Sequence, residues 1–164
     1  MVNGDTLLPE FDAEVANTRR MFAAIPDEKL DFQPHEKSYT LLKLAAHVAN
    51  LPSWIALTLA TDELDLAAGF DQPDPKNMAD VVAIFDGAVA EGRTALEGAS
   101  ADAMTADWTL RTGDEVHFQM PKGVVLRSFV FNHLVHHRAQ ICVYLRLLDI
   151  PVPGMYGPSA DETM

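Results

Sequence analysis

The chain has 164 residues, 48% of them hydrophobic and 22% charged, which is typical of a single globular domain, here residues 1–164. Twelve lysines and arginines against 24 aspartates and glutamates give a formal net charge of −12, which disfavours nucleic acid and anionic membranes as partners. Because Cys142 is the single cysteine, and neither a signal peptide nor an apolar run of bilayer length is evident, we expect a soluble cytoplasmic protein without disulfides.

Two amphipathic helices are predicted in the first 60 residues. The first, over residues 8–24, carries one packed stripe made of Leu8, Phe11, Val15, Thr18, Phe22 and Ile25. The second, over residues 41–60, follows the hydroxyl caps Ser38 and Thr40. Its inward face spans about 120° of rotation and consists of Leu44, His47, Val48, Leu51, Trp54 and Ile55. Pro52 predicts a kink, because its ring crowds the Val48 carbonyl and removes one backbone hydrogen bond.

Two further helices are predicted in the second half of the chain. One begins after the N-cap Asn77 and ends at Gly98, and the other runs from Lys122 to Leu148. Between them, residues 108–111 and 116–120 flank a turn and indicate a short β-hairpin, with an irregular crossover loop as the alternative. Four amphipathic segments with one long connection before the last favour an all-α fold, a four-helix bundle.

The last predicted helix places two histidines on its apolar stripe. At 100° of rotation per residue, the stripe covers roughly 80° and contains Val130, His133, His137, Ile141, Tyr144 and Leu148. His133 and His137 are one turn apart and can reach a single ion, and His47 on the facing helix could complete the set. Neutral imidazole suits zinc, nickel, copper or iron, and three protein ligands leave a position open for water or substrate.

Other side chains near this level have weaker roles. The alternative for each histidine of the set is a hydrogen-bonded core residue, but three unpartnered buried imidazoles would cost several kcal/mol in total, at about 1–3 kcal/mol each. His136 lies off the stripe and is expected beside the ligands, although His133 and His136 also form a possible ligand pair. Trp54, Gln140 and Tyr144 are candidate pocket walls, with core packing as the stronger alternative for Tyr144.

Several familiar catalytic patterns are absent from the sequence. There is no Glu-x-x-His of di-iron bundles, no His-Glu-x-x-His of zinc proteases, no glycine-rich phosphate loop and no Gly-x-Ser-x-Gly elbow. Cys142 points away from the histidine face and is expected to pack rather than react, and His35 and His117 are expected to be solvated.

The sequence resembles the DinB/YfiT-like superfamily, whose name is shared with an unrelated DNA polymerase. The resemblance is carried by Leu44-Ala45-Ala46-His47, His133-x-x-His136-His137-Arg138-Ala139-Gln140, Tyr144-Leu145-Arg146, Pro151-x-Pro153 and the ending Tyr156 to Glu162. It implies an up-down-down-up four-helix bundle, frequent homodimers and a three-histidine site, often for zinc or nickel, with ligands His47, His133 and His137.

The resemblance also implies candidate reactions. Characterised relatives include transferases and isomerases that use a low-molecular-weight thiol, and some hydrolases. The leading hypothesis is therefore a divalent-metal-dependent, thiol-dependent S-transferase that acts on small electrophiles. The alternatives are a metal-dependent hydrolase, or a non-catalytic metal-binding bundle with a sensor or structural role. A fourth protein ligand, such as His136 or a tail carboxylate of Asp161 or Glu162, would favour the non-catalytic alternative.

Overall fold

The computed structural model describes residues 3–69 and 73–162, most of which are helical. In chain order the α-helices are α1 (Leu8–Ala23), α2 (Leu41–Asn50), α3 (Ser53–Ala60), α4 (Met78–Glu97), α5 (Ala101–Thr105), α6 (Lys122–Val125) and α7 (Asn132–Leu147). A π-helical segment, Leu126–Phe131, joins α6 to α7. The strands are β1 (Glu63–Asp65), β2 (Asp107–Thr112) and β3 (Glu115–Pro121).

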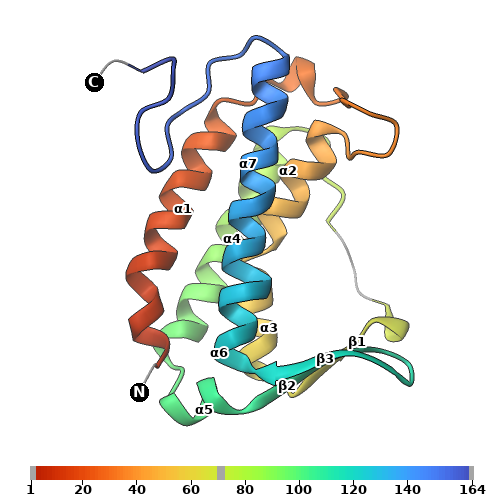
Figure 1. Cartoon of the computed structure of the whole chain (residues 1–164), viewed down its shortest axis with the longest axis vertical. Coiled ribbons are helices and arrows are strands. Elements are labelled where there is room, and N and C mark those ends of the chain that lie inside the picture. The colour runs from red at the N-terminus through yellow and green to blue at the C-terminus, as the bar shows by residue number, and fades with distance from the viewer. Residues whose placement is uncertain (1–2, 70–72, 163–164) are drawn as a thin grey trace.

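The long helices lie side by side along the long axis of the molecule, and the small sheet lies at one end (Figure 1). Helix α1 runs away from the sheet end, α2 with α3 and then α4 run toward it, and α6 with α7 run away again (Figure 1). Helix α4 packs against α1, α2 and α3, and α7 packs against α1 and α2. Within the described part of the chain, no helix is long and apolar enough to cross a membrane.

Helix starts follow the predicted capping residues. The Thr40 hydroxyl accepts a hydrogen bond from the Lys43 amide at 3.3 Å, and the Asn77 side chain accepts one from the Asp80 amide at 2.9 Å. Each bond satisfies one of the amides that the first turn of a helix leaves without a partner. Thr40 and Asn77 therefore fix where α2 and α4 begin. The start at Thr40 also sets the position of His47, which lies seven residues later on α2.

Pro52 breaks the second predicted helix into α2 and α3. Since Pro52 has no amide hydrogen, the Val48 carbonyl accepts instead from the Leu51 amide at 3.4 Å. Helix α4 approaches this break closely at Gly92, where a Cβ atom would lie 2.9 Å from the Pro52 carbonyl oxygen. The glycine is thus required by close packing, and the predicted kink is confirmed.

The predicted hairpin is present as β2 and β3, but it belongs to a three-stranded sheet. Strand β1 pairs in parallel with β2, and β2 pairs antiparallel with β3. Arg111 joins the first two strands, with ion pairs of 2.6 Å to both Glu63 and Asp65. The sequence expectation missed β1 because its three residues are too short for a strand periodicity and depend on a partner 46 positions later.

The expected all-α four-helix bundle with a short hairpin is therefore correct in its helical character and too simple in detail. The second helix is divided in two at Pro52, the last contains a π-helical turn, and α5 and strand β1 were not anticipated. The main core lies between α1, α2, α4 and α7 and includes Met21, Phe22, Leu44, Val48, Val81, Phe85, Ile141 and Leu145. A second cluster lies nearer the sheet and includes Phe11, Ile55, Leu96, Leu126 and Phe131.

The C-terminal tail is anchored to α1 and α7 through a buried arginine. Arg138 is 1% exposed, forms an ion pair of 2.5 Å with Glu14, and donates to the Thr18 hydroxyl at 3.1 Å. The Tyr156 hydroxyl lies 2.6 Å from the Arg138 guanidinium and donates to the Glu14 carboxylate at 2.9 Å. Further along the tail, Asp161 pairs with Arg146 at 2.6 Å.

Candidate metal centre

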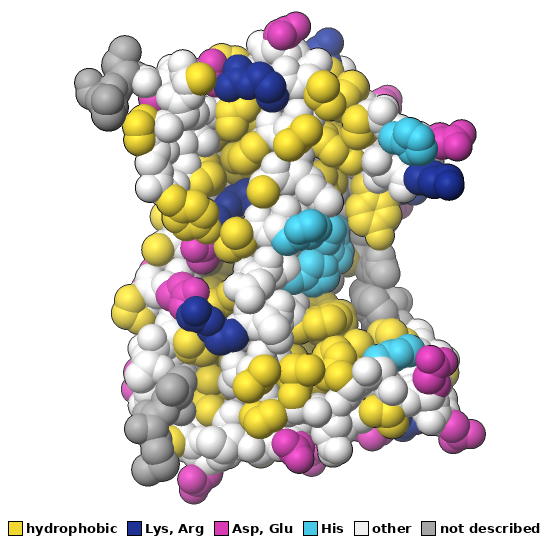
Figure 2. Space-filling view, viewed as in Figure 1, with side chains coloured by type: hydrophobic (Ala, Val, Ile, Leu, Met, Phe, Trp, Pro, Cys, Tyr) yellow, Lys and Arg dark blue, Asp and Glu magenta, His cyan; other side chains and the backbone are white. Residues whose placement is uncertain are grey.

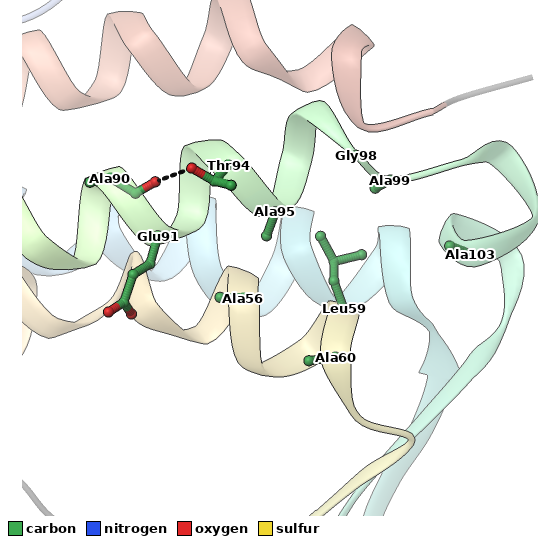
Figure 3. Close-up of a pocket in the computed structure, with 10 residues that line it drawn as sticks. All are labelled: Ala56, Leu59, Ala60, Ala90, Glu91, Thr94, Ala95, Gly98, Ala99 and Ala103. Carbon is green, nitrogen blue, oxygen red and sulfur yellow. Dashed lines mark hydrogen bonds between the residues drawn. The ribbon is translucent and has the colours of Figure 1, made fainter.

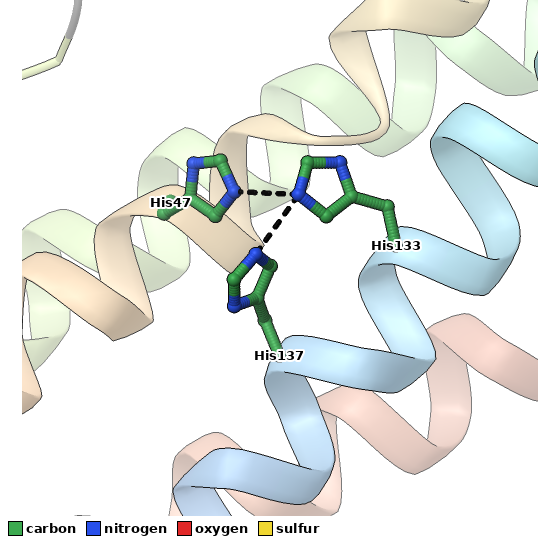
Figure 4. A group of neighbouring side chains, drawn as sticks. All are labelled: His47, His133 and His137. Carbon is green, nitrogen blue, oxygen red and sulfur yellow. Dashed lines mark hydrogen bonds between the residues drawn. The ribbon is translucent and has the colours of Figure 1, made fainter. Parts of the chain in front are cut away.

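Three imidazoles from two helices converge at the middle of the bundle (Figure 4). His47 lies on α2, one turn before the break at Pro52, and His133 and His137 lie on successive turns of α7. The Nε2 atom of His133 is 3.2 Å from Nε2 of His47 and 2.9 Å from Nε2 of His137. One ring nitrogen from each of the three residues lies within 4.8 Å of the others, so the group could hold a metal ion.

Two further contacts determine which ring nitrogens carry hydrogen. The His133 Nδ1 atom lies 3.3 Å from the Phe129 carbonyl oxygen, and the His137 Nδ1 atom lies 2.7 Å from Oε1 of Gln140. Both partners are acceptors, so each neutral ring carries its proton on Nδ1 and its lone pair on Nε2. The two lone pairs then face each other at 2.9 Å, which is unfavourable unless a cation lies between them.

The donor set and its spacing fit a transition metal. Metal–nitrogen bonds of about 2.0–2.1 Å place neighbouring ligand atoms about 2.9–3.4 Å apart at angles from roughly 90° to 110°. The two measured separations, 3.2 and 2.9 Å, fall in this range. Across residues 3–69 and 73–162, no carboxylate or thiol joins the group, and such an all-imidazole set favours zinc, nickel, copper or iron over calcium or magnesium.

The surroundings keep the imidazoles neutral. Burial, followed by the proximity of His137 and His133, lowers the pKa of His47 to about 4. Burial also lowers the pKa values of His133 and His137, although the Phe129 carbonyl and the Gln140 side chain oppose this effect. Because only the neutral ring offers a lone pair, the three residues are ready to bind a metal at neutral pH without first losing protons.

The group lies at the edge of the core rather than inside it. The sequence placed the imidazoles in the buried stripe, but all three side chains are only partly buried, whereas their stripe neighbours Val130 and Ile141 are 1% and 0% exposed. Figure 2 shows histidine side chains at the surface in the narrow middle of the molecule. This partial exposure gives the site access to solvent, which a purely structural set of buried imidazoles would lack.

A cavity of about 530 Å³ opens beside His47. Its lining combines polar and apolar side chains from α2, the start of α3, the loops before α2 and the segment before α4: Asp31, Tyr39, Thr40, Leu42, Lys43, Ala46, His47, Asn50, Leu51, Trp54, Pro73, Asp74 and Pro75. This volume is within the range of small-molecule sites, which is about 300–1,000 Å³. The sequence expectation named Trp54 but missed Tyr39, Lys43 and Asn50, although the last two flank His47 by three or four residues on the same helix face.

The remaining predicted site residues have distinct positions. Gln140 orients His137 and lies 3.2 Å from His136 through Nε2, so it links the two histidines. His136 is exposed and lies outside the converging group. Tyr144 is 8% exposed and packs in the core; it does not line the cavity itself, but its hydroxyl donates at 3.1 Å to the carbonyl of Tyr39, which does.

The side chains considered as a fourth ligand are occupied elsewhere. Asp161 accepts from Arg146 and from the Val152 amide, and Glu162 accepts from the amides of Gly154 and Ser159. The two remaining histidines, which the sequence predicted to be solvated, are exposed: His117 on β3 contacts the Thr112 hydroxyl at 2.8 Å, and His35 in a loop accepts from the Lys37 amide. The protein therefore contributes three nitrogens to the group described here, and the structure leaves one side of it facing solvent and the cavity.

A second hollow, of about 710 Å³, lies between α3, α4 and α5 (Figure 3). Small side chains predominate in its lining, and Glu91 is its one titratable member: Ala56, Leu59, Ala60, Ala90, Glu91, Thr94, Ala95, Gly98, Ala99 and Ala103. The Thr94 hydroxyl in this lining donates to the Ala90 carbonyl at 2.9 Å (Figure 3). None of these residues belongs to the histidine group, so the smaller cavity beside His47 is the candidate site.

Comparison with known proteins gives one consistent picture. Residues 1–163 match the DinB family, and the chain is 30% identical over 165 residues to the uncharacterized protein YrdA of Bacillus subtilis, covering 96% of this chain and 90% of that one. A DinB-like protein from Bacillus cereus has a TM-score of 0.71 and 22% identity, and covers 93% of this chain and 97% of its own. The DinB-like protein YjoA of Bacillus subtilis has a TM-score of 0.73 and 13% identity, with coverage of 94% and 99%.

A more distant similarity links the fold to an enzyme. A histidine-to-alanine mutant of the mycothiol-dependent maleylpyruvate isomerase has a TM-score of 0.53 and 13% sequence identity. The match covers 93% of this chain but only 65% of the isomerase, which is the longer protein. At this identity the likeness concerns the fold alone.

Proposed function

Since the chain belongs to the DinB family, we propose that it is a divalent-metal-dependent enzyme, and specifically a thiol-dependent S-transferase that acts on small electrophiles. We propose His47, His133 and His137 as the ligands, and zinc or nickel as the metal. The observation that carries the proposal is the convergence of three Nε2 atoms, two with their lone pairs fixed toward each other, beside a cavity of about 530 Å³.

The protein's own groups would hold the reactants and the ligands in place. Gln140 and the Phe129 carbonyl fix the orientation of His137 and His133, and hydrogen bonds of this kind also raise ligand basicity. The cavity beside His47 would accept the thiol, with Lys43 and Asn50 available for polar contacts and Trp54 for apolar ones. A divalent ion held by the three imidazoles would supply positive charge that stabilises a thiolate or a hydroxide.

The thiol-dependent reaction is favoured by similarity of fold to the mycothiol-dependent isomerase and by the partly apolar cavity. The second candidate is hydrolysis, which the solvent-facing side of the same group supports. A non-catalytic metal site is disfavoured, because structural zinc sites have four protein ligands and the described residues supply three.

Metal analysis of the purified protein and of two variants tests the ligand assignment. We expect about one divalent ion per chain in the wild type, a loss of stoichiometric binding in His137→Ala, and full metal content in His136→Ala. His136 is the matched control, because it is a neighbouring imidazole on the same helix that lies outside the converging group. Unchanged metal content in His137→Ala would contradict the assignment.

A spectroscopic titration then tests the reaction class. The absorption of the cobalt-loaded protein reports on the ligands of the metal, and we expect it to change when cysteine or glutathione is added. A matched alcohol, serine, should leave the spectrum unchanged. The absence of any thiol-dependent change across a panel of low-molecular-weight thiols would contradict the transferase and favour the hydrolase.

A further inference from the structure

The sheet end of the candidate centre is lined by aromatic rings. The Phe129 ring lies 5.6 Å from the His133 ring in an edge-on arrangement, and it also packs against Trp54 at 5.6 Å and Phe118 at 5.1 Å. These three residues come from α3, β3 and the π-helical segment, and all three are partly buried rather than enclosed. We call Trp54, Phe118 and Phe129 the aromatic wall.

The hairpin supplies its part of the aromatic wall through strand alternation. Along β3, Phe118 and Met120 are partly buried while Gln119 between them is exposed, so Phe118 and Met120 share the inner face. A register shift in the ladder pairs Val116 with Arg111, which places Val116 on the outer face. Phe118 and Met120 lie opposite Leu110 and Trp108 of β2, which are 5% and 0% exposed. Trp108, Leu110 and Val125 thus form the closed core of this end, and Phe118 and Phe129 form its partly open margin.

The two sides of the candidate centre differ in chemistry. The cavity beside His47 carries Asp31, Lys43 and Asp74, whereas the side toward the sheet carries the rings of the aromatic wall. Figure 2 shows hydrophobic side chains between the central histidines and the sheet end. Trp54 belongs to both sides, because it lines the cavity and packs on Phe129.

We propose that the aromatic wall binds a flat apolar group of the second substrate, so that hairpin β2–β3 determines the specificity of the site. The inference rests on the proposed function: the cavity beside His47 would take the thiol, and the aromatic wall would hold the electrophile against the His133 side of the centre. Partly exposed rings favour a flat partner, which can stack or meet them edge-on, over a puckered group of equal size.

The two tryptophans allow a binding test that needs no knowledge of the natural substrate. Trp54 lies in the aromatic wall, while Trp108 is 0% exposed and its indole donates to the Thr61 hydroxyl at 3.0 Å. Benzyl alcohol and cyclohexylmethanol serve as neutral probes of similar size, one flat and one puckered, and the indole N–H resonances are followed by NMR with zinc present. The variant Trp54→Phe removes and thereby identifies the Trp54 resonance.

We expect benzyl alcohol to shift the Trp54 resonance and leave that of Trp108 in place, with binding at least fivefold tighter than that of cyclohexylmethanol. Phe129→Leu and Phe118→Leu, which keep apolar bulk but lose the ring, should each weaken benzyl alcohol binding at least fivefold. Val116→Ala, on the outer face of the same strand and 57% exposed, should leave it unchanged. A single dispersed Trp108 resonance shows that each variant is folded, although Phe118→Leu will itself displace that resonance, because the Phe118 ring lies 6.1 Å from the Trp108 ring.

Equal binding of the two probes, or unchanged binding in both leucine variants, would overturn the inference. The metal content of the same samples separates this result from a failure of the proposed function. A protein that binds zinc stoichiometrically but does not discriminate between the probes would disprove the aromatic wall alone. A wild type that binds no metal would disprove the proposed function, while the NMR comparison would still decide whether the aromatic wall binds flat ligands.

Discussion

At the scale of single residues, the Nδ1 atoms of His133 and His137 decide which ring nitrogen is free to bind a metal. These atoms point away from the proposed metal position and form hydrogen bonds of their own. His133 and His137 would be ambiguous donors without the Phe129 carbonyl and the Gln140 side chain, because a neutral imidazole can carry its proton on either nitrogen. The two acceptors remove that ambiguity. Gln140 also contacts His136, so one side chain would position a proposed ligand, His137, and holds the neighbouring imidazole as well.

Gln140→Leu should weaken metal binding by about 10–100-fold, because the apolar side chain cannot accept from His137 Nδ1 and the ring loses its fixed orientation. Competition with a chelator of known affinity measures the change. His136→Ala is the control, since it leaves the Gln140 oxygen in place and should alter affinity by less than about threefold on the same reasoning. Equal affinities in wild type and Gln140→Leu would show that this hydrogen bond does not support the site.

The lowered pKa of His47 predicts how stability depends on pH in the metal-free protein. The folded-state pKa is about 4, against about 6.5 in the unfolded chain, so the unfolded state binds more protons between these values. This contribution to stability is fully present above pH 6.5 and is lost as the pH falls toward 4. Its size is about 1–2 kcal/mol, less than the full shift would give because the ring is only partly buried.

Urea unfolding of wild type and His47→Gln, both in EDTA, measures this contribution at pH 7, 6, 5 and 4. As the pH falls through this range, the unfolding free energy of the wild type should decrease more than that of His47→Gln. Acidic groups elsewhere titrate alike in both proteins and therefore cancel. A difference that stays constant between pH 7 and pH 4 would contradict the lowered pKa.

At the scale of elements, the edge of α7 that carries His133 and His137 toward α2 adjoins a fully buried stripe. Ile141 lies in both, and the buried stripe also contains Leu134, Arg138 and Leu145, each at most 3% exposed. The spacing of four, three and four residues in the buried stripe indicates a buried position for Arg138, although the sequence expectation did not assign it a role. A charged side chain at such a position requires a partner, and Glu14 of α1 provides it.

Glu14→Ala should lower the free energy of unfolding by about 3–5 kcal/mol, because it leaves the Arg138 charge buried without its counterion. Chemical denaturation at neutral pH measures the loss. Asp12→Ala is the matched control two residues away, since its partner Arg93 is 41% exposed and such a pair contributes less than about 1 kcal/mol. Equal effects of the two substitutions would mean that the Arg138 charge is solvated.

At the scale of the whole molecule, an ion at the histidine group would join α2 to α7 across the bundle. These helices are far apart in sequence and contact each other through the main core, so a shared metal would bind only the folded chain. The formal net charge of −12 also raises the local concentration of cations around the protein. Metal binding and folding are therefore expected to be linked.

Removal of the metal should lower the melting temperature. A ligand at 100 times its dissociation constant stabilises the folded state by about 2.7 kcal/mol, which corresponds to about 5–10 °C for a chain of this length. Calorimetry of the metal-loaded and EDTA-treated protein measures the shift, and His137→Ala should show none. If metal removal lowered the melting temperature of His137→Ala by as much as that of the wild type, the stabilising ion would bind elsewhere.

The sequence by itself determined the local features of this protein. Periodicity located the long helices, Thr40, Asn77 and Pro52 set starts and a break, and residues 112–114 predicted the hairpin, because each depends on neighbours within a few positions. The i, i+4 spacing of His133 and His137 likewise requires only that the segment be helical. The family resemblance agrees with the match to the DinB family over residues 1–163.

Only the tertiary structure decided the features that depend on distant contacts. Strand β1 exists because β2 pairs with it, Arg138 is buried because Glu14 and Tyr156 meet it, and Phe118 and Phe129 come together because the hairpin folds onto the π-helical segment. The approach of His47 to His133, at 3.2 Å, depends on how α2 packs against α7. Periodicity tells which face of a helix is buried, but not what lies opposite, and the chemistry of this site depends on the side chains that face each other across the bundle.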